Sequence, residues 1–206
     1  MDNTTDFIFD LPQADTLKPS STRKVHIRRL NDILHLSIQR GDMLRARQVW
    51  SILARCKEYD WMAMWRMGLL LANPHSHPPS SNTNTVTARL DYLRVMMLRC
   101  PDDQESILSE IVLQLIFSEN FKDAIDELDL YLPSFPFQNN PVLHLYAGLS
   151  LLCLASKNRD EFVDQLSTSN HLRNSQTHFD RVITLDAHNV IASTFLEQVL
   201  RSVLME

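Results

Sequence analysis

Apolar positions along this chain recur at the spacing of one helical face, in segments that come in pairs. Each pair has an apolar stripe on a first helix, a turn, a small residue near the start of a second helix, and a large residue four positions later. The small residues are Ala46, Ala88 and Ala124, and a weaker fourth pair has Ser175 in that place. Apolar side chains three and four positions apart share one face of an α-helix. The pattern therefore predicts repeated helical hairpins.

The separation of these small residues indicates a repeat with inserted loops. Successive separations are 42, 36 and 51 residues, whereas the tetratricopeptide repeat has a period of about 34 residues. The implied insertions are 8, 2 and 17 residues. The first falls in residues 73–85, which are rich in Pro, Ser and Asn, and the last falls between Ser156 and Arg173, where the periodicity is poor. The prediction is a tetratricopeptide-like helical-hairpin solenoid with loops at both places.

The pattern divides the chain into a tail and one repeat domain. Residues 1–24 are predicted to be a flexible acidic tail with one apolar island, Phe7–Phe9, which could dock on a partner or fold back on its own domain. Residues 25–206 form the repeat domain, and the last helix has the half-polar character of a solenoid cap. Helices are expected at about 25–39, 42–57, 60–72, 85–99, 105–118, 121–132, 141–155, 160–166, 173–185 and 189–204.

Composition supports an all-α fold. Only three glycines are present: Gly41 lies in a predicted turn, while Gly68 and Gly148 lie inside apolar helical stretches, where a missing side chain lets two helices approach closely. No alternating apolar and polar run is long enough for a sheet. The net charge is −5, so no strong global field attracts nucleic acid. No secretory leader or membrane-spanning stretch is predicted, and a soluble intracellular protein is expected.

Catalytic and metal-binding patterns are missing from the sequence. No phosphate-binding glycine loop, zinc-protease motif or serine elbow occurs. His75 and His77 flank Ser76 in a loop without nearby acidic or cysteine ligands, so a metal site there is unfavourable. We therefore expect a non-enzymatic protein with no catalytic residue, metal, cofactor or small-molecule substrate.

Two helices carry a second apolar stripe in addition to the stripe that faces the core. A helix that is apolar all round is buried on both sides or lies in an interface. The two readings stand evenly: inserted loops or the tail cover these stripes, or the stripes form a groove for a partner segment. The candidate partner-binding residues are Met62, Trp65, Leu69, Leu113, Ile116 and Phe117.

A basic cluster lies where the tail meets the first predicted helix. It contains Arg23, Lys24, Arg28 and Arg29. The simpler interpretation is a solvated helix face that pairs with acidic residues, and the sharper one is contact with DNA phosphates. No interleaved aromatic residue or reading helix supports recognition of bases.

The segment from Ile33 to Trp50 resembles the opening repeat of one family. Its most specific part is Leu36-Ser37-Ile38-Gln39-Arg40-Gly41-Asp42, followed by Arg45-Ala46-Arg47. The helix that begins at Trp61 and the turn Asn120–Ile125 fit the same arrangement. The family is the small tetratricopeptide subunit of the fungal RNA polymerase I core factor, and the resemblance covers roughly residues 25–135.

The resemblance implies a scaffold subunit of the nucleus and nucleolus that acts in pre-initiation complex assembly at the ribosomal DNA promoter. The implied partners are a subunit like the general factor TFIIB and a large subunit of the core factor, with TATA-binding protein and RNA polymerase I as further candidates. Promoter DNA would be reached through the complex. The alternative is a general tetratricopeptide adaptor that binds a partner peptide or helix in another complex.

Overall fold

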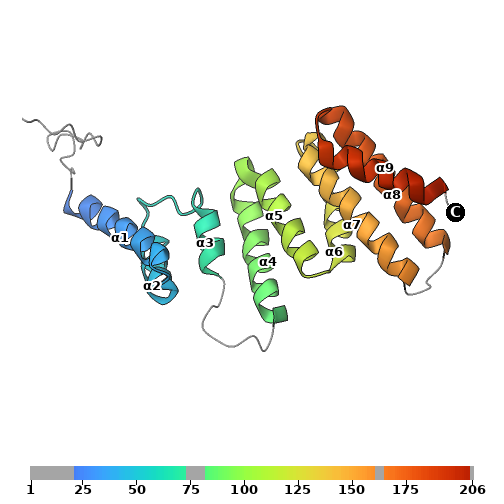
Figure 1. Ribbon diagram of the computed structural model, residues 1–206. Helices are drawn as coiled ribbons and strands as arrows, with labels where there is room; N and C mark the ends of the chain where they lie inside the picture. Colours follow the sequence, from blue (N-terminus) through green and yellow to red (C-terminus); the bar gives the residue numbers. More distant parts are fainter. Residues whose placement is uncertain (1–20, 73–81, 161–164, 205–206) are drawn as a thin grey trace, which may run out of the picture. The chain divides into compact units, whose positions relative to one another are not determined.

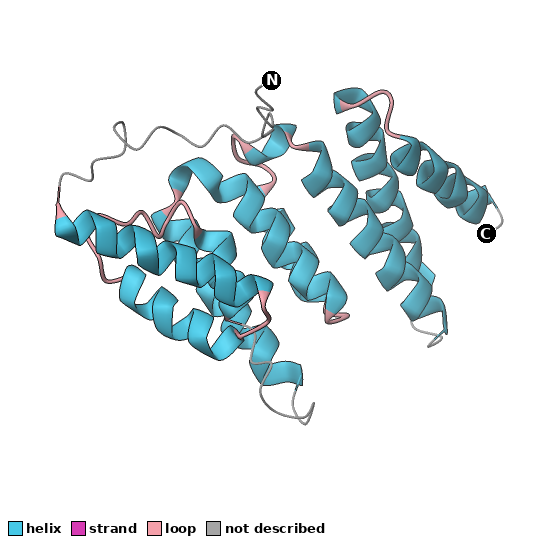
Figure 2. Cartoon of the chain, turned by 60° about the vertical axis from the view of Figure 1, so that its left-hand side comes forward, coloured by secondary structure: helices cyan, strands magenta, loops and turns pink. Residues whose placement is uncertain are grey.

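The computed structural model describes residues 21–72, 82–160 and 165–204 (Figure 1). All regular structure in these ranges is helical, and no strand occurs in them (Figure 2). The prediction of an all-α protein is therefore confirmed. The chain divides into two compact units, Met1–Leu71 (unit 1) and Ala72–Glu206 (unit 2).

Unit 1 is a helical hairpin with a short third helix. It consists of α1 (Thr22–Gln39), α2 (Met43–Leu53) and α3 (Trp65–Leu71). The side chain of Ser21 caps the start of α1, and that of Asp42 caps α2 by accepting from the Arg45 amide at 3.1 Å. Such caps satisfy amide groups that have no partner inside the helix. Polar residues therefore set where both helices begin.

The core of unit 1 joins all three helices. Its buried members are Leu34, Ala46, Val49, Leu53 and Leu71. Arg47 also links α2 to α3, because its Nε donates to the Leu71 carbonyl at 2.8 Å. A short helix such as α3 is marginal by itself, so these contacts hold it in place.

Unit 2 is a succession of helices in which each packs against the next. The helices are α4 (Asn82–Arg99), α5 (Gln104–Phe117), α6 (Phe121–Tyr131), α7 (Pro141–Asp160), α8 (Gln165–Leu185) and α9 (Val190–Leu204). Two short 3₁₀ turns, η2 (Pro101–Asp103) and η3 (Phe137–Asn139), precede α5 and α7. Helix α5 also contacts α7 directly, two helices further along the chain. This nearest-neighbour packing is that of a helical solenoid, whereas the tetratricopeptide detail stays a prediction.

Small residues allow α7 and α8 to approach closely, as the sequence predicted for Gly148. A Cβ at Gly148 would lie 2.7 Å from the Phe179 ring. The hydroxyl of Ser175, which is fully buried, donates to the Gly148 carbonyl at 2.8 Å. Ser175 therefore does occupy the small-residue place of this hairpin, with Ala46 and Ala124 equally buried in theirs.

Two details of the predicted repeat are wrong. Ala88 is exposed, and α4 instead buries Leu90, Leu93 and Met97. Helix α3 has only seven residues, so the first helix expected for this pair is much shorter than the sequence predicted. The 17-residue insertion is also not a loop: α7 continues to Asp160 and α8 begins at Gln165. The extra residues lengthen two helices.

At the start of the chain, the structure describes only the last part of the predicted tail. Thr22–Lys24 lie in α1, whereas residues 1–20, including Phe7–Phe9, lie outside the described residues. Helix α9 packs against α8 through Ala192 and Val199. Its exposed positions include Ser193 and Glu197 but also Val190 and Ile191. Within the described ranges, no helix has the length and apolarity needed to cross a bilayer.

Candidate partner-binding groove and basic surface

Unit 2 has a groove of about 950 Å³ between α4, α5 and α6. Helix α4 contributes one wall and the end of α5, with the turn into α6, contributes the other. The residues that line it are Val86, Thr87, Arg89, Leu90, Arg94, Gln114, Leu115, Phe117, Ser118, Glu119, Asn120 and Asp123. Its size is that of a site for several side chains of a partner.

The groove combines an apolar floor with charged groups. Leu90 and Leu115 are buried, whereas the Phe117 ring is 75% exposed. Arg94 spans the groove edge and forms an ion pair with Glu127 of α6 at 2.7 Å. The hydrogen bond that Arg94 donates to Glu127 is the main cause that raises the pKa of Arg94. Arg89 is half-buried, and its Nε is buried without a hydrogen-bond partner.

The turn from α5 to α6 forms one end of the groove. Glu119 has a φ of 60°, a left-handed backbone conformation that residues other than glycine rarely adopt. The turn is held by the Asn120 amide, which donates to the Leu115 carbonyl at 3.0 Å, and by the Glu119 amide, which donates to the Ile116 carbonyl at 3.0 Å. These bonds satisfy carbonyls at the end of α5 and keep Phe117 beside the turn.

The six residues that the sequence predicted for partner binding differ in how far their side chains are buried. Trp65 is 3% exposed and Leu69 is 7% exposed, so neither lies on an open face of the chain. The Arg66 guanidinium lies 4.9 Å from the centre of the Trp65 ring. Met62 is exposed, and Leu113 and Ile116 are half-buried.

Only Phe117, among these six, lines the groove. Sequence reasoning missed Arg89 and Glu119. The unpaired Nε of Arg89 and the backbone angle of Glu119 do not affect residue spacing, so no sequence pattern could have identified them.

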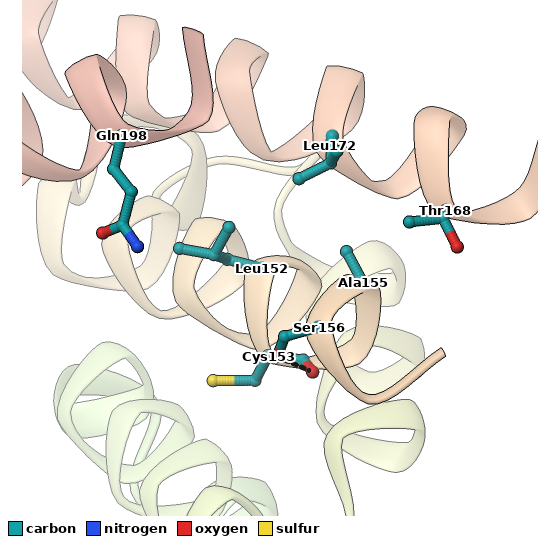
Figure 3. Close-up of a pocket in the computed structure, with 7 residues that line it drawn as sticks. All are labelled: Leu152, Cys153, Ala155, Ser156, Thr168, Leu172 and Gln198. Atoms are coloured by element: carbon teal, nitrogen blue, oxygen red, sulfur yellow. Dashed lines mark hydrogen bonds between the residues drawn. The ribbon is translucent and has the colours of Figure 1, made fainter. Parts of the chain in front are cut away.

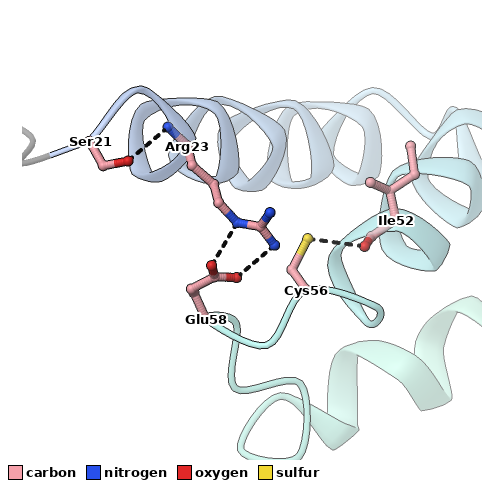
Figure 4. Close-up of polar contacts among 5 residues, drawn as sticks. All are labelled: Ser21, Arg23, Ile52, Cys56 and Glu58. Atoms are coloured by element: carbon pink, nitrogen blue, oxygen red, sulfur yellow. Dashed lines mark hydrogen bonds and ion pairs between the residues drawn. The ribbon is translucent and has the colours of Figure 1, made fainter.

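The predicted basic residues Arg23, Lys24, Arg28 and Arg29 are all exposed on α1. Arg23 is paired with Glu58, which follows α2: Nε lies 2.6 Å from Oε1, and Nη2 donates to Oε2 at 3.1 Å (Figure 4). The side-chain hydrogen bond from Arg23 lowers the pKa of Glu58 and the same bond raises the pKa of Arg23. Arg23 is therefore less available to phosphate than its neighbours.

The charges of the two units have opposite signs. Unit 1, Met1–Leu71, contains eleven Lys and Arg against eight Asp and Glu, a net charge of +3, and its residues 21–71 alone have a net charge of +6. Residues 72–206 contain nine against seventeen, a net charge of −8. The whole chain has a net charge of −5, so the total charge does not show this difference between the units. A polyanion would be attracted to unit 1 and repelled by unit 2.

A second pocket, of about 280 Å³, is lined by α7, α8 and α9 (Figure 3). It contains the free thiol of Cys153, beside Ser156, whose hydroxyl donates to the Cys153 carbonyl at 2.8 Å. Burial raises the pKa of the Cys153 thiol, which disfavours the reactive thiolate.

Metal-binding candidates give no site in the part of the chain that the structure covers. No group of three or more metal-ligating side chains occurs among those residues. His75 and His77 lie outside the described residues.

The comparison with protein families assigns the chain. The model of a family described as "RNA polymerase I-specific transcription initiation factor Rrn11" matches residues 6–162, which is more than half of the sequence. The chain belongs to the Rrn11 family. A curated relative with the same description, from Schizosaccharomyces pombe, is 28% identical over 147 residues, which cover 66% of this chain and 69% of the relative. No solved structure matches.

The Rrn11 family match confirms the resemblance that the sequence suggested, and it extends further in both directions. It begins in the acidic tail and ends after α7. The basic face of α1 and the groove between α4, α5 and α6 both lie inside the match, whereas α8 and α9 lie beyond it.

Proposed function

We propose that the chain is a non-enzymatic scaffold subunit of the RNA polymerase I core factor, and that it acts in pre-initiation complex assembly at the ribosomal DNA promoter. Membership of the Rrn11 family carries this proposal. The relative's description as an RNA polymerase I-specific transcription initiation factor supports it. A transcription initiation factor of this class works in the nucleus, and we propose the nucleolus as the site within it.

The proposed partners are the TFIIB-like subunit and the large subunit of the core factor. TATA-binding protein and RNA polymerase I are further candidates. An all-helical chain with a groove and several exposed apolar side chains, among them Leu98 and Phe117, is suited to binding other proteins. Partner contact remains a prediction for the six candidate residues, and the exposed ones among them are the better candidates. The six are Met62, Trp65, Leu69, Leu113, Ile116 and Phe117.

Affinity purification of the tagged full-length chain from its own cells tests the proposal. We expect two stoichiometric nuclear subunits, one of them TFIIB-like, and restoration of promoter-dependent transcription by RNA polymerase I when the complex is returned to a depleted extract. Recovery of a chaperone or another complex would support the alternative of a general tetratricopeptide adaptor. Recovery of the chain by itself would oppose both functions.

Promoter DNA is reached mainly through the complex in this proposal, with auxiliary phosphate contact by α1. Each phosphate contact contributes about −0.9 to the slope of log affinity against log salt concentration. Replacing Lys24, Arg28 and Arg29 by alanine should therefore reduce the magnitude of that slope, measured by filter binding of the complex, by up to about 3. Arg23→Ala is the matched control and should change it less, because Arg23 is paired with Glu58. A stronger effect of Arg23→Ala would contradict this assignment.

A further inference from the structure

The outer face of α2 carries an apolar stripe that faces solvent. Leu44, Gln48 and Ile52 follow one another at intervals of four positions, so they share one side of the helix. Leu44 is 66% exposed and Ile52 is 48% exposed. The opposite side of the helix contributes Ala46, among others, to the core of unit 1. The stripe therefore lies open to solvent in the described part of unit 1.

One arginine lies at each end of this stripe. Arg45 follows Leu44, and Arg55 lies three positions after Ile52 in the turn that ends the helix. Both arginines are exposed, and no ion pair involves either of them in residues 21–72, 82–160 and 165–204. Helix α2 itself contains no acidic residue. The face therefore suits a segment with apolar side chains between two carboxylates.

We propose that residues 6–11 of the same chain, Asp-Phe-Ile-Phe-Asp-Leu, dock on this outer face of α2. The rings of Phe7 and Phe9 pack on the apolar stripe, and the carboxylates of Asp6 and Asp10 pair with the arginines at its two ends. The contact lies within one chain, so it does not depend on the proposed function.

The charges of the segment and of the helix have matching separations. Arg45 and Arg55 are ten positions apart, which corresponds to about 15 Å along a helix. Asp6 and Asp10 are four positions apart, and a chain of that length extends to about 14 Å. Both carboxylates can therefore reach an arginine at the same time, with the two rings between them.

The start of α1, to which residues 1–20 are joined, lies beside the end of α2. Arg23 in the first turn of α1 lies 2.6 Å from Glu58, five positions after the end of α2 (Figure 4). Phe9 lies twelve positions before Ser21, and a chain of that length spans up to about 40 Å. Helix α2 is only about 16 Å long. Residues 6–11 can therefore reach any part of α2.

The net charges favour this occupant. Residues 1–20 contain four Asp against one Lys, a net charge of −3, whereas residues 21–71 have a net charge of +6. Unit 2, with −8 over residues 72–206, would repel the same segment. Attachment to α1 also gives the segment an effective concentration in the millimolar range at α2, which a second copy or a separate protein lacks.

The match to the Rrn11 family includes both sides of the proposed contact. It begins at residue 6 and omits the first five residues. The segment 6–11 therefore falls in the same matched region as α1 and α2. This extent is expected if the segment and the hairpin act together.

Photo-crosslinking tests the contact. In the full-length chain, purified with the subunits that accompany it, p-benzoylphenylalanine replaces Phe9 as the probe. We expect irradiation to join position 9 to a peptide of the same chain between Leu44 and Arg55. Co-expression of isotope-labelled and unlabelled chains identifies crosslinks between two copies. A crosslink to a second copy, to another subunit or to unit 2, or the absence of any crosslink, would overturn the proposal.

Charge exchange then tests the pairing of carboxylates with arginines. Arg45→Glu together with Arg55→Glu should reduce the yield of the crosslink at least tenfold. Adding Asp6→Arg and Asp10→Arg should restore it. Substitutions at residues 6 and 10 would not repair a folding defect of α2, so the rescue separates lost docking from lost folding. A loss that is not restored contradicts the inferred ion pairs.

A matched control makes the same total charge change on α1. Arg28 and Arg29 are exposed there, and Arg28→Glu together with Arg29→Glu should leave the yield of the crosslink nearly unchanged. An equal loss in this control would show that general attraction to unit 1 holds the segment, and it would contradict docking on α2.

Discussion

The α1–α2 hairpin and the α5–α6 hairpin reach the same backbone arrangement with different residues. In the first, Gly41 has φ of 75° and the Asp42 amide donates to the Ser37 carbonyl at 2.9 Å. In the second, Glu119 has φ of 60° and the Asn120 amide donates to the Leu115 carbonyl at 3.0 Å. Both bonds join residues five positions apart at the end of a helix, as in the Schellman motif.

The second helix of each hairpin also packs in the same way. Ala46 and Ala124 each lie five positions after the left-handed residue of their turn, and both are fully buried. A small side chain at this position lets the two helices of a pair approach closely. The equivalence of the two hairpins therefore extends from the turn into the core.

The hairpins differ in the conformational cost of the left-handed residue in the turn. Gly41 adopts its conformation without strain, and Asp42 caps α2 by accepting from the Arg45 amide. Glu119 is strained, and the side chain of Asn120 makes no capping hydrogen bond. The strained turn is the one that lines the groove between α4, α5 and α6. The same turn geometry therefore has a conformational cost at Glu119 that it does not have at Gly41.

Core truncation gives the largest expected effect and tests whether the two hairpins unfold separately. Leu34 and Leu128 are both fully buried, so Leu34→Ala and Leu128→Ala should each cost about 2–5 kcal/mol of stability. In hydrogen exchange of the assembled protein, Leu34→Ala should accelerate exchange in α1–α3 and Leu128→Ala in α5–α6, because the two residues lie in different compact units. Equal acceleration in both units for either variant would show one cooperative unit.

A histidine pair distinguishes unit 2 from unit 1 in its response to pH. The Nδ1 atoms of His144 and His178 lie 3.2 Å apart, and the Nε2 of His144 lies 3.1 Å from the Gln138 carbonyl. The carbonyl requires a proton on Nε2 of His144, so His178 donates to its Nδ1. Burial lowers the pKa of His178 to about 4, and burial together with nearby Arg181 lowers that of His144.

Acid should therefore destabilise α7–α8 while leaving α1–α2 less affected. His178 is neutral in both the folded and unfolded states above its unfolded pKa of about 6.5. Between about 6.5 and about 4, the unfolded chain takes up a proton that the folded chain does not. Stability should fall across that window by roughly 2–3 kcal/mol. His178→Gln should flatten the fall in chemical denaturation measured at several pH values, whereas an unchanged profile would exclude the pair as its source.

Exchanging the turn residues should have a smaller effect, of opposite sign in the two hairpins. Glu119→Gly should stabilise α5–α6 by about 0.5–1 kcal/mol because it removes left-handed strain, less the added entropy of the unfolded glycine. Gly41→Ala should destabilise α1–α2 by a similar amount, and nothing lies within 4 Å of the added Cβ to change that sign. Thermal melts of both variants provide the measurement. A destabilising Glu119→Gly would show that the Glu119 side chain makes a stabilising contact that outweighs its strain.

The Arg23–Glu58 pair should give the smallest effect. Both side chains are well exposed, at 63% and 39%, and such pairs are screened by solvent. The pKa of Glu58 is lowered mainly by the hydrogen bond from Arg23, so its contribution is present above the unfolded pKa and is lost as the pH falls through the folded value. Glu58→Gln should leave the melting temperature close to that of the wild type at neutral pH. A large decrease would show that the pair fastens α1 to the segment after α2.

The sequence by itself determined the local features of this protein. Helical spacing of apolar residues located most helices to within a few positions, because periodicity reports which residues share a face. Gly41 identified a turn, and Ala46, Ala124 and Ser175 marked close helix contacts, since only small side chains fit there. The stretch from Leu36 to Arg47 pointed to the family that the comparison later confirmed.

Tertiary structure decided which faces are covered. Periodicity cannot show whether a neighbouring element covers an apolar stripe, so the sequence did not reveal that Trp65 and Leu69 are buried while Phe117 is exposed. Ala88 had the expected spacing and is exposed, and the helix expected to pair with it has only seven residues. The unpaired Nε of Arg89 and the left-handed backbone of Glu119 depend on distances and dihedral angles set by the packing of three helices. Those quantities arise from contacts between residues distant in sequence, and residue order carries no direct record of them.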